Sequence, residues 1–208
     1  MTQITKCRIT ADYKTTDKFE PLFKPDNDWH NNACLNYGND VTRNYIDGYK
    51  KAADKLVNDI DSDIDLLVYP IVFLYRHHVE ISLKEIIESG HFLLGTKCNK
   101  KNHDLNALWN EVKHIAKEIW DKEFPEKDFE FIDHVIREFE KYDKPSTSFR
   151  YAKTNGKKSN PDLSHINIRH LRDMIEKFNE MLLLIDCRIS LYSEHVEEFR
   201  FRKSNGTL

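Results

Sequence analysis

Apolar residues recur every three or four positions through most of the chain, which is the spacing of an amphipathic helix. Five such stretches are separated by polar or proline-containing segments, and the alternation typical of β-strands is nearly absent. The pattern predicts an all-α fold, an antiparallel bundle of about five helices. We expect these helices to begin near Asn39 or Asp40, at Asp65, at His103-Asp104, after Pro125 and after Ser164.

The second and fifth predicted helices have features that affect the architecture. The second covers about 65–89 and contains Pro70, so it either begins near Val68 or bends at the proline, and Gly90 is its expected C-cap. The fifth keeps helical spacing for about 28 residues, or about 42 Å. This length exceeds what a compact body of this size requires, so its far end should project or pack on another subunit.

The apolar positions also predict the core. The first helix carries an apolar stripe formed by Val41, Tyr45, Tyr49, Ala52, Leu56 and Ile60. The large side chains expected at the centre of the bundle are Leu74, Leu83, Leu108, Trp109, Met174 and Phe178.

The sequence predicts that the chain is divided into three regions. Residues 1–38 lack sustained periodicity and are expected to form an irregular N-terminal arm. Residues 39–199 are expected to form the helical bundle, interrupted by a loop of about 20 residues between 144 and 163. Residues 200–208 are expected to be a basic, flexible tail.

Composition limits the classes of partner. The 208 residues carry a formal net charge of -3, so nucleic-acid binding would need a local basic patch, such as Arg200–Lys203 or Lys153–Lys158. The four cysteines are far apart and form no CxxC pair, which is typical of free thiols in a cytoplasmic protein. The longest apolar run, Leu66–Tyr75, is far shorter than the ~20 residues of a membrane span, so no membrane association is expected.

The second predicted helix combines an apolar sequence with four ionisable groups. Arg76, Glu80 and Lys84 recur every four residues and share one face, with His77 beside them. Burying such groups without partners is costly, so they mark either a buried polar network or a site.

Two other segments would bring further polar side chains to this place. If neighbouring helices are antiparallel, the end of the second helix, the start of the third and the loop before the fifth lie at one end of the bundle. We therefore expect Lys84, His103 and Arg150 to lie close together, with Tyr151 nearby and with Glu80 orienting Arg76 and Arg150. Such a cluster could hold a phosphate, with histidine moving a proton, or it could only stabilise the fold.

Other chemistries have weaker sequence signals. His77, His78 and Glu80 do not follow the HExxH spacing, and no glycine-rich phosphate loop is present, so we expect neither a metal nor a cofactor. No GxSxG or paired Cys/His nucleophile pattern occurs. A small-molecule enzyme that uses His77 and His103 would need a closed pocket at the end of the bundle.

Three motifs follow one another in this chain: Glu80 and Lys84 of an E-x-x-x-K helix, His103-Asp104-Leu105 at a helix start, and Arg150-Tyr151 before the last helix. Their order resembles the HEPN superfamily of helical domains. The resemblance covers about residues 40 to 195, with Ala152 in place of the proline of the last motif. It implies a metal-independent ribonuclease or an RNA-binding or nucleotide-binding protein, often of a toxin–antitoxin, CRISPR or antiphage system.

The resemblance also points to a second pair of residues and to a dimer. HEPN ribonucleases use an R-x(4–6)-H motif near the start of the last helix, and it acts across a dimer interface. Arg188 and His195 match this spacing, but they lie late in the helix, and one such match is expected by chance. We expect a homodimer that involves the last helix near Ile189 and Tyr192. The alternative is a non-catalytic dimerising module that binds a partner protein or a nucleotide.

Overall fold

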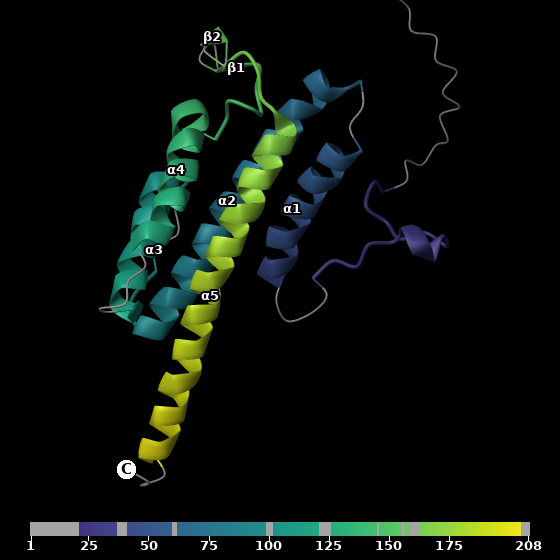
Figure 1. The fold of residues 1–208 in the computed structure, drawn as a ribbon. Coiled ribbons are helices and arrows are strands. Elements are labelled where there is room, and N and C mark those ends of the chain that lie inside the picture. Colours follow the sequence, from purple (N-terminus) through teal and green to yellow (C-terminus); the bar gives the residue numbers. More distant parts are fainter. Residues whose placement is uncertain are drawn as a thin grey trace, which may run out of the picture. The chain divides into compact units, whose positions relative to one another are not determined.

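A computed structural model of the chain contains two units, Met1–Gly38 and Asn39–Leu208. The first unit holds, in its described part, a short 3-10 turn η1 at Trp29–Asn31. The second unit contains five α-helices packed together, so the protein is all-α, as predicted (Figure 1). The residues that the structure describes are 21–36, 41–59, 62–98, 102–120, 126–144, 146–154, 157–158 and 163–204.

Each predicted helix is present. A minimal antiparallel hairpin lies between the last two helices, in the segment predicted as a loop, and pairs Lys153 with Lys158. The elements of the second unit are α1 (Val41–Asn58), α2 (Ile64–Leu94), α3 (Leu105–Trp120), α4 (Glu126–Asp143), β1 (Lys153–Thr154), β2 (Lys157–Lys158) and α5 (Ile168–Ser204).

The helices run in two directions. α1 is antiparallel to α5, because Lys50 pairs with Glu176 while Arg43, earlier in α1, pairs with Asp186 further along α5. α4 is antiparallel to α3, since Leu105 at the start of α3 contacts Glu140 near the end of α4. α2, α3 and α5 share one direction, and α1 and α4 take the other (Figure 1).

The parallel arrangement of α2 and α3 differs from our expectation that these neighbours are antiparallel. The start of α3 lies beside the middle of α2, where His103 contacts Glu80. Further along both helices, His91 of α2 contacts Glu111 of α3. The start of α3 therefore lies level with the middle of α2, and the polar residues of α2 do not lie at an end of the bundle.

The glycines of α2 explain where this helix ends. Gly90, the expected C-cap, lies inside the helix, where an added Cβ would overlap the side chain of Ile115. It is thus required for the close approach of α2 to α3. The helix ends at Gly95, whose φ of 66° is the left-handed conformation of a C-cap. Pro70 lies inside the helix, because α2 already begins at Ile64.

α5 is longer than predicted, with 37 residues, or about 55 Å. Its N-cap is Asn167 rather than Ser164, since the Asn167 Oδ1 accepts the backbone N–H groups of Arg169 and His170. The helix continues through 200–204, which we expected to be a flexible tail, and residues 205–208 lie outside the described part. The C-terminal turns of α5 extend past the other helices (Figure 1).

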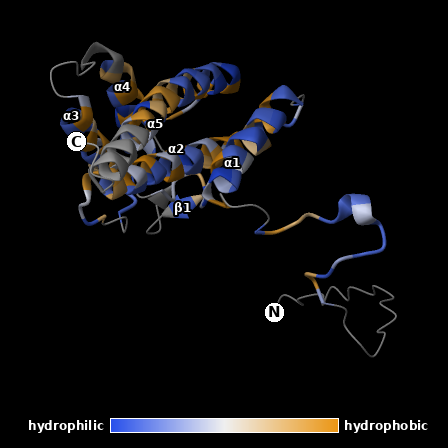
Figure 2. Cartoon of the chain, turned by 90° about the horizontal axis from the view of Figure 1, so that it is seen from below, coloured by the Kyte–Doolittle hydropathy of each residue, from blue (hydrophilic) through white to orange (hydrophobic). Residues whose placement is uncertain are grey.

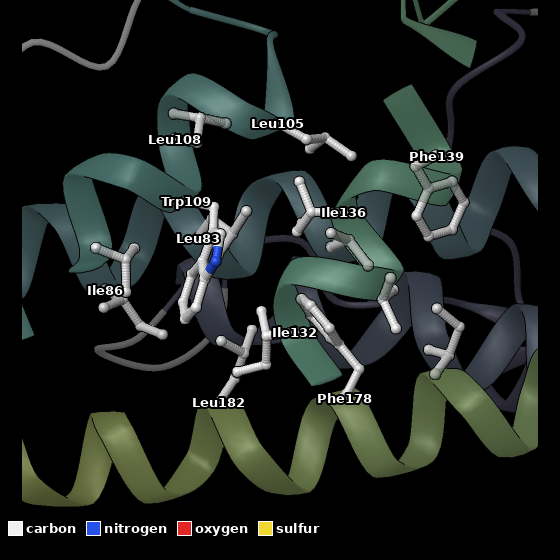
Figure 3. Close-up of a cluster of buried hydrophobic side chains, with 14 of the residues drawn as sticks. Leu83, Ile86, Leu105, Leu108, Trp109, Ile132, Ile136, Phe139, Phe178 and Leu182 are labelled. Atoms are coloured by element: carbon white, nitrogen blue, oxygen red, sulfur yellow. The ribbon is translucent and has the colours of Figure 1, made fainter. Parts of the chain in front are cut away.

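The core lies between the inner faces of the helices, and hydrophobic and hydrophilic residues alternate along each one (Figure 2). Of the six residues predicted at its centre, Leu83, Leu108, Trp109 and Phe178 are buried (Figure 3), while Leu74 and Met174 are half-buried. No helix in the described part is long and apolar enough to cross a membrane.

The buried face of α1 differs from the predicted stripe. Tyr45 and Ala52 are exposed, and Ile60 lies outside the described residues. The face of α1 that packs against the other helices follows a row of residues that is displaced around the helix axis from the predicted stripe. The buried residues of that row are Ile46, Ala53 and Val57.

Candidate polar site around Glu80

Glu80 lies near the middle of α2 and is almost completely buried. Its carboxylate accepts three hydrogen bonds. Oε1 accepts from Lys84 Nζ and from His103 Nδ1, both at 2.7 Å, and Oε2 accepts from Arg76 Nη1 at 2.9 Å. The structure therefore brings together four residues that the sequence pointed to. We refer to Glu80, Arg76, Lys84 and His103 as the Glu80 cluster.

The electrostatic environment of Glu80 contains two opposing effects. Burial alone raises the pKa of the Glu80 carboxyl, because it disfavours the charged form. Hydrogen bonds from Lys84, His103 and Arg76 act in the other direction, and the net result is a pKa below its ordinary value. Glu80 is therefore a carboxylate at neutral pH, so both cations of its own helix have a charged partner.

Arg76 forms the inner side of the cluster and is fully buried. Besides Glu80, its guanidinium donates from Nη2 to the backbone carbonyl of His103 at 3.0 Å. It also donates from Nε to the backbone carbonyl of Asp143 at 3.3 Å, and this nitrogen lies 3.5 Å from the Asp143 carboxylate. Arg76 thus joins α2 to the segment before α3 and to the end of α4. These contacts satisfy a buried charge, as a structural clamp requires.

Asp143 is a member of this network that the sequence analysis missed. It is buried at the last residue of α4, where its Oδ1 accepts the backbone N–H of Ser148 at 2.7 Å. Burial raises the pKa of the Asp143 carboxyl, and the Ser148 N–H and Arg76 partly offset that effect. An acidic residue at a helix C-terminus is unfavourable for the helix dipole. A negative charge at the end of a predicted helix was the signal in the sequence that could have identified Asp143 as a member of the network.

The outer side of the cluster reaches solvent. The His103 side chain is 73% exposed and that of Lys84 is 19% exposed. His103 is held next to the start of α3, where Asp104 Oδ1 caps the helix by accepting the N–H of Ala107 at 3.0 Å. The outer side therefore presents an imidazole and an ammonium group to solvent.

His77 lies in different surroundings. Its ring is stacked on Phe73, with a centroid distance of 5.9 Å, and packs against the edge of Tyr49 of α1 at 4.4 Å. Burial is the largest cause of a lowered pKa for His77. The imidazole is therefore a neutral ring in the α1–α2 interface.

Arg150 joins this aromatic group and does not contact Glu80. Its Nε donates to the backbone carbonyl of Ser146 at 2.6 Å, and its guanidinium lies 5.6 Å from the ring centre of Phe73. The exposed ring of Tyr151 lies at 5.8 Å from the same guanidinium. The expectation that Glu80 orients Arg150 is therefore wrong. The loop reaches α2 at Phe73, about one turn before Arg76, and the Arg150 guanidinium lies over that ring.

The second candidate pair is described only in part. The guanidinium of Arg188 lies 5.8 Å from the ring centre of Trp120, at the end of α3. The side chain of His195 lies outside the described residues, although its backbone belongs to α5. Within the described part of the chain, no three His, Cys, Asp or Glu side chains are grouped closely enough to bind a metal ion.

Comparisons with known proteins add no further assignment. No family model matches the chain, and neither a curated protein nor a solved structure matches it. We therefore infer a function from the motifs of the sequence and from the geometry of the Glu80 cluster.

Proposed function

We propose that this chain is a HEPN-like RNA-binding protein and that the exposed side of the Glu80 cluster contacts an RNA phosphate. The observation that carries the proposal is the shared contact at Glu80 Oε1, which holds Lys84 and His103 side by side. Lys84 retains N–H groups for a phosphate oxygen, and an ammonium is a common phosphate ligand.

The same geometry supports metal-independent cleavage of the RNA. Because the hydrogen bond to Glu80 uses Nδ1 of His103, the other ring nitrogen, Nε2, is the one that can accept a proton from a ligand. Nε2 would take the proton of a ribose 2′-hydroxyl while the 2′-oxygen bonds to the adjacent phosphorus and the phosphorus–5′-oxygen bond breaks. The departing 5′-oxygen would take a proton from water. Lys84 would offset the charge that develops on the phosphate. We also propose a role in antiphage defence or in a toxin–antitoxin pair, and this part of the proposal is supported only by the resemblance of the motifs to those of HEPN proteins.

The test is RNA binding and cleavage in EDTA. A fluorescein-labelled single-stranded RNA is titrated with the protein and with His103→Ala and Lys84→Ala. We expect cleavage to fall by about 10²–10⁴-fold in His103→Ala, the typical loss of a general base. Lys84→Ala should weaken binding.

Two exposed residues outside the cluster provide matched controls, Lys51 of α1 and His114 of α3. Lys51→Ala and His114→Ala should behave as the unchanged protein does. The proposal fails if the unchanged protein neither binds nor cleaves RNA, or if the control variants lose as much activity as the cluster variants.

The alternative function, a non-catalytic dimerising module, is favoured by the surface of α5. Leu184 and Leu191 are 68% and 59% exposed, and seven residues place them on the same face of the helix. Tyr192 is partly exposed nearby, whereas Ile189 of the expected interface is buried against its own bundle. An exposed apolar stripe on a projecting helix is suited to pairing with a second copy.

Light scattering at micromolar concentration tests this alternative. We expect a dimer for the unchanged protein and a monomer for the double variant Leu184→Asp/Leu191→Asp. Ser190→Asp, at an exposed position between them, is the matched control and should remain dimeric. A monomer in the unchanged protein would contradict the dimer, and a dimer in the double variant would exclude this face.

A further inference from the structure

A cleft lies between the second half of α4 and the first turns of α5, and Asp143, which contacts Arg76, is one of its lining residues. Its volume is about 320 Å³. Cavities that bind small molecules measure ≈ 300–1,000 Å³, so this cleft is at the small end of that range. Neither the RNA site nor the α5 stripe uses these residues, so the cleft is a separate feature of the fold.

The walls of the cleft are apolar and aromatic. Val72 of α2, Phe139 of α4, Phe149 of the following loop and Ile175 of α5 line it, and all four are buried. Tyr142 adds a third aromatic ring. Buried side chains from four segments give the cavity a fixed shape. Such walls bind an apolar body, and their rings favour an aromatic one, because aromatic pairs gain energy from offset or edge contacts.

The rim of the cleft is rich in hydrogen-bond donors. His134 from α4, His165 from the segment before α5, and His170 from α5 all line it and are all exposed. The first residues of α5 also lie at this rim, so the positive end of a long helix dipole is next to the imidazoles. These groups complement an acceptor-rich or anionic head group.

The acidic residues of the cleft limit the charge of that head group. The Asp143 carboxylate is occupied by the Ser148 N–H and lies next to Arg76. Glu138 is exposed at the rim and would repel a second negative charge. A singly charged carboxylate therefore suits this rim better than a phosphate dianion.

We propose that the cleft binds a small aromatic carboxylate. Its ring would lie between Phe139, Phe149 and Val72, and its carboxylate would accept hydrogen bonds at His165 and His170. This site is independent of RNA binding, so either proposal can fail while the other holds.

The probe for this site is 2-naphthoate, and its affinity for the full chain is measured by isothermal titration calorimetry. Its neutral isostere 2-naphthamide has nearly the same shape and tests the need for a negative head group. We expect the amide to bind at least about tenfold more weakly than the carboxylate, which corresponds to ~1.4 kcal/mol. The double variant His165→Ala/His170→Ala should weaken naphthoate binding by a similar factor. Both side chains are exposed, so this variant should fold normally.

His114→Ala is the matched control, because His114 is an exposed histidine of α3 that does not line the cleft. It should leave the naphthoate affinity unchanged. The proposal is overturned if the unchanged protein shows no saturable binding up to the solubility limit of naphthoate. It is also overturned if the carboxylate and the amide bind equally well, or if the double variant and His114→Ala have the same affinity.

Discussion

The two sides of the Glu80 carboxylate have opposite surroundings although they belong to one hydrogen-bonded cluster. On the inner side, Arg76 is fully buried and connects three segments of the fold. On the outer side, Lys84 and His103 share one carboxylate oxygen and reach solvent. Residues of one ionic cluster can therefore have different roles in the protein. The inner side holds the helices together, and only the outer side can contact a ligand.

The largest expected effect is the loss of the inner cation. Arg76→Ala leaves Glu80 and Asp143 as buried carboxylates with fewer partners, and breaking a buried pair in this way costs ~3–5 kcal/mol. Urea denaturation should show a loss of this size in the free energy of unfolding. Arg137→Ala, at an exposed position of α4, should change it by less than about 0.5 kcal/mol. A loss below about 1 kcal/mol for Arg76→Ala would contradict a structural role for the inner side.

The second effect concerns the carboxylate that both sides share. Glu80→Gln keeps the shape but removes the charge, and we expect a loss of ~1–3 kcal/mol at neutral pH. The pKa of Glu80 is lowered in the folded state, so its stabilisation is complete above the ordinary pKa of ~4.3 and is lost as the pH falls through the lower folded value. The difference between the two proteins should therefore shrink below about pH 4.

Unfolding curves measured from neutral to acidic pH give this difference directly. Asp143 and Glu140 have raised pKa values, chiefly through burial, and so contribute the opposite pH dependence. Because both proteins contain these two residues, their contribution cancels in the comparison to first order. A difference that grows as the pH falls would mean that Glu80 is not stabilised as a carboxylate.

The residues of the Glu80 cluster could be predicted from the sequence, whereas the direction of α3 could not. The four-residue spacing of Arg76, Glu80 and Lys84 indicated their shared face, and the His103-Asp104 signal placed a helix start. What the sequence did not reveal was the direction of α3. The local pattern is compatible with either direction of α3, and the parallel arrangement includes the close contact between Gly90 and Ile115. Tertiary packing of this kind leaves no local pattern in the sequence.

The same limit explains the residues that were misplaced. Arg150 was assigned to the cluster on the assumption that the loop after α4 lies at the same end as Lys84. In the structure, the loop contacts Phe73, about one turn before Arg76 on α2. The all-α class and the helix boundaries near Asp104 and Pro125 depend on local periodicity and capping, and these were predicted correctly.

A smaller effect is expected on the outer side. His103→Ala removes one of three donors to Glu80, and its side chain is mostly exposed, so the free energy of unfolding should fall by less than about 1 kcal/mol. The urea midpoint measures this change under the conditions used for Arg76→Ala. A loss as large as that of Arg76→Ala would remove the distinction between the two sides.

The salt dependence of RNA affinity tests the central claim most directly, that the outer side contacts a phosphate. Dissociation constants of a labelled single-stranded RNA are measured over a range of KCl concentrations for the unchanged protein, Lys84→Ala and Lys51→Ala. Each phosphate contact contributes about -0.7 to the slope of log K against log salt for single strands, so Lys84→Ala should reduce the slope by about that amount. Lys51→Ala should leave it unchanged. Equal slopes for Lys84→Ala and the unchanged protein would contradict the account.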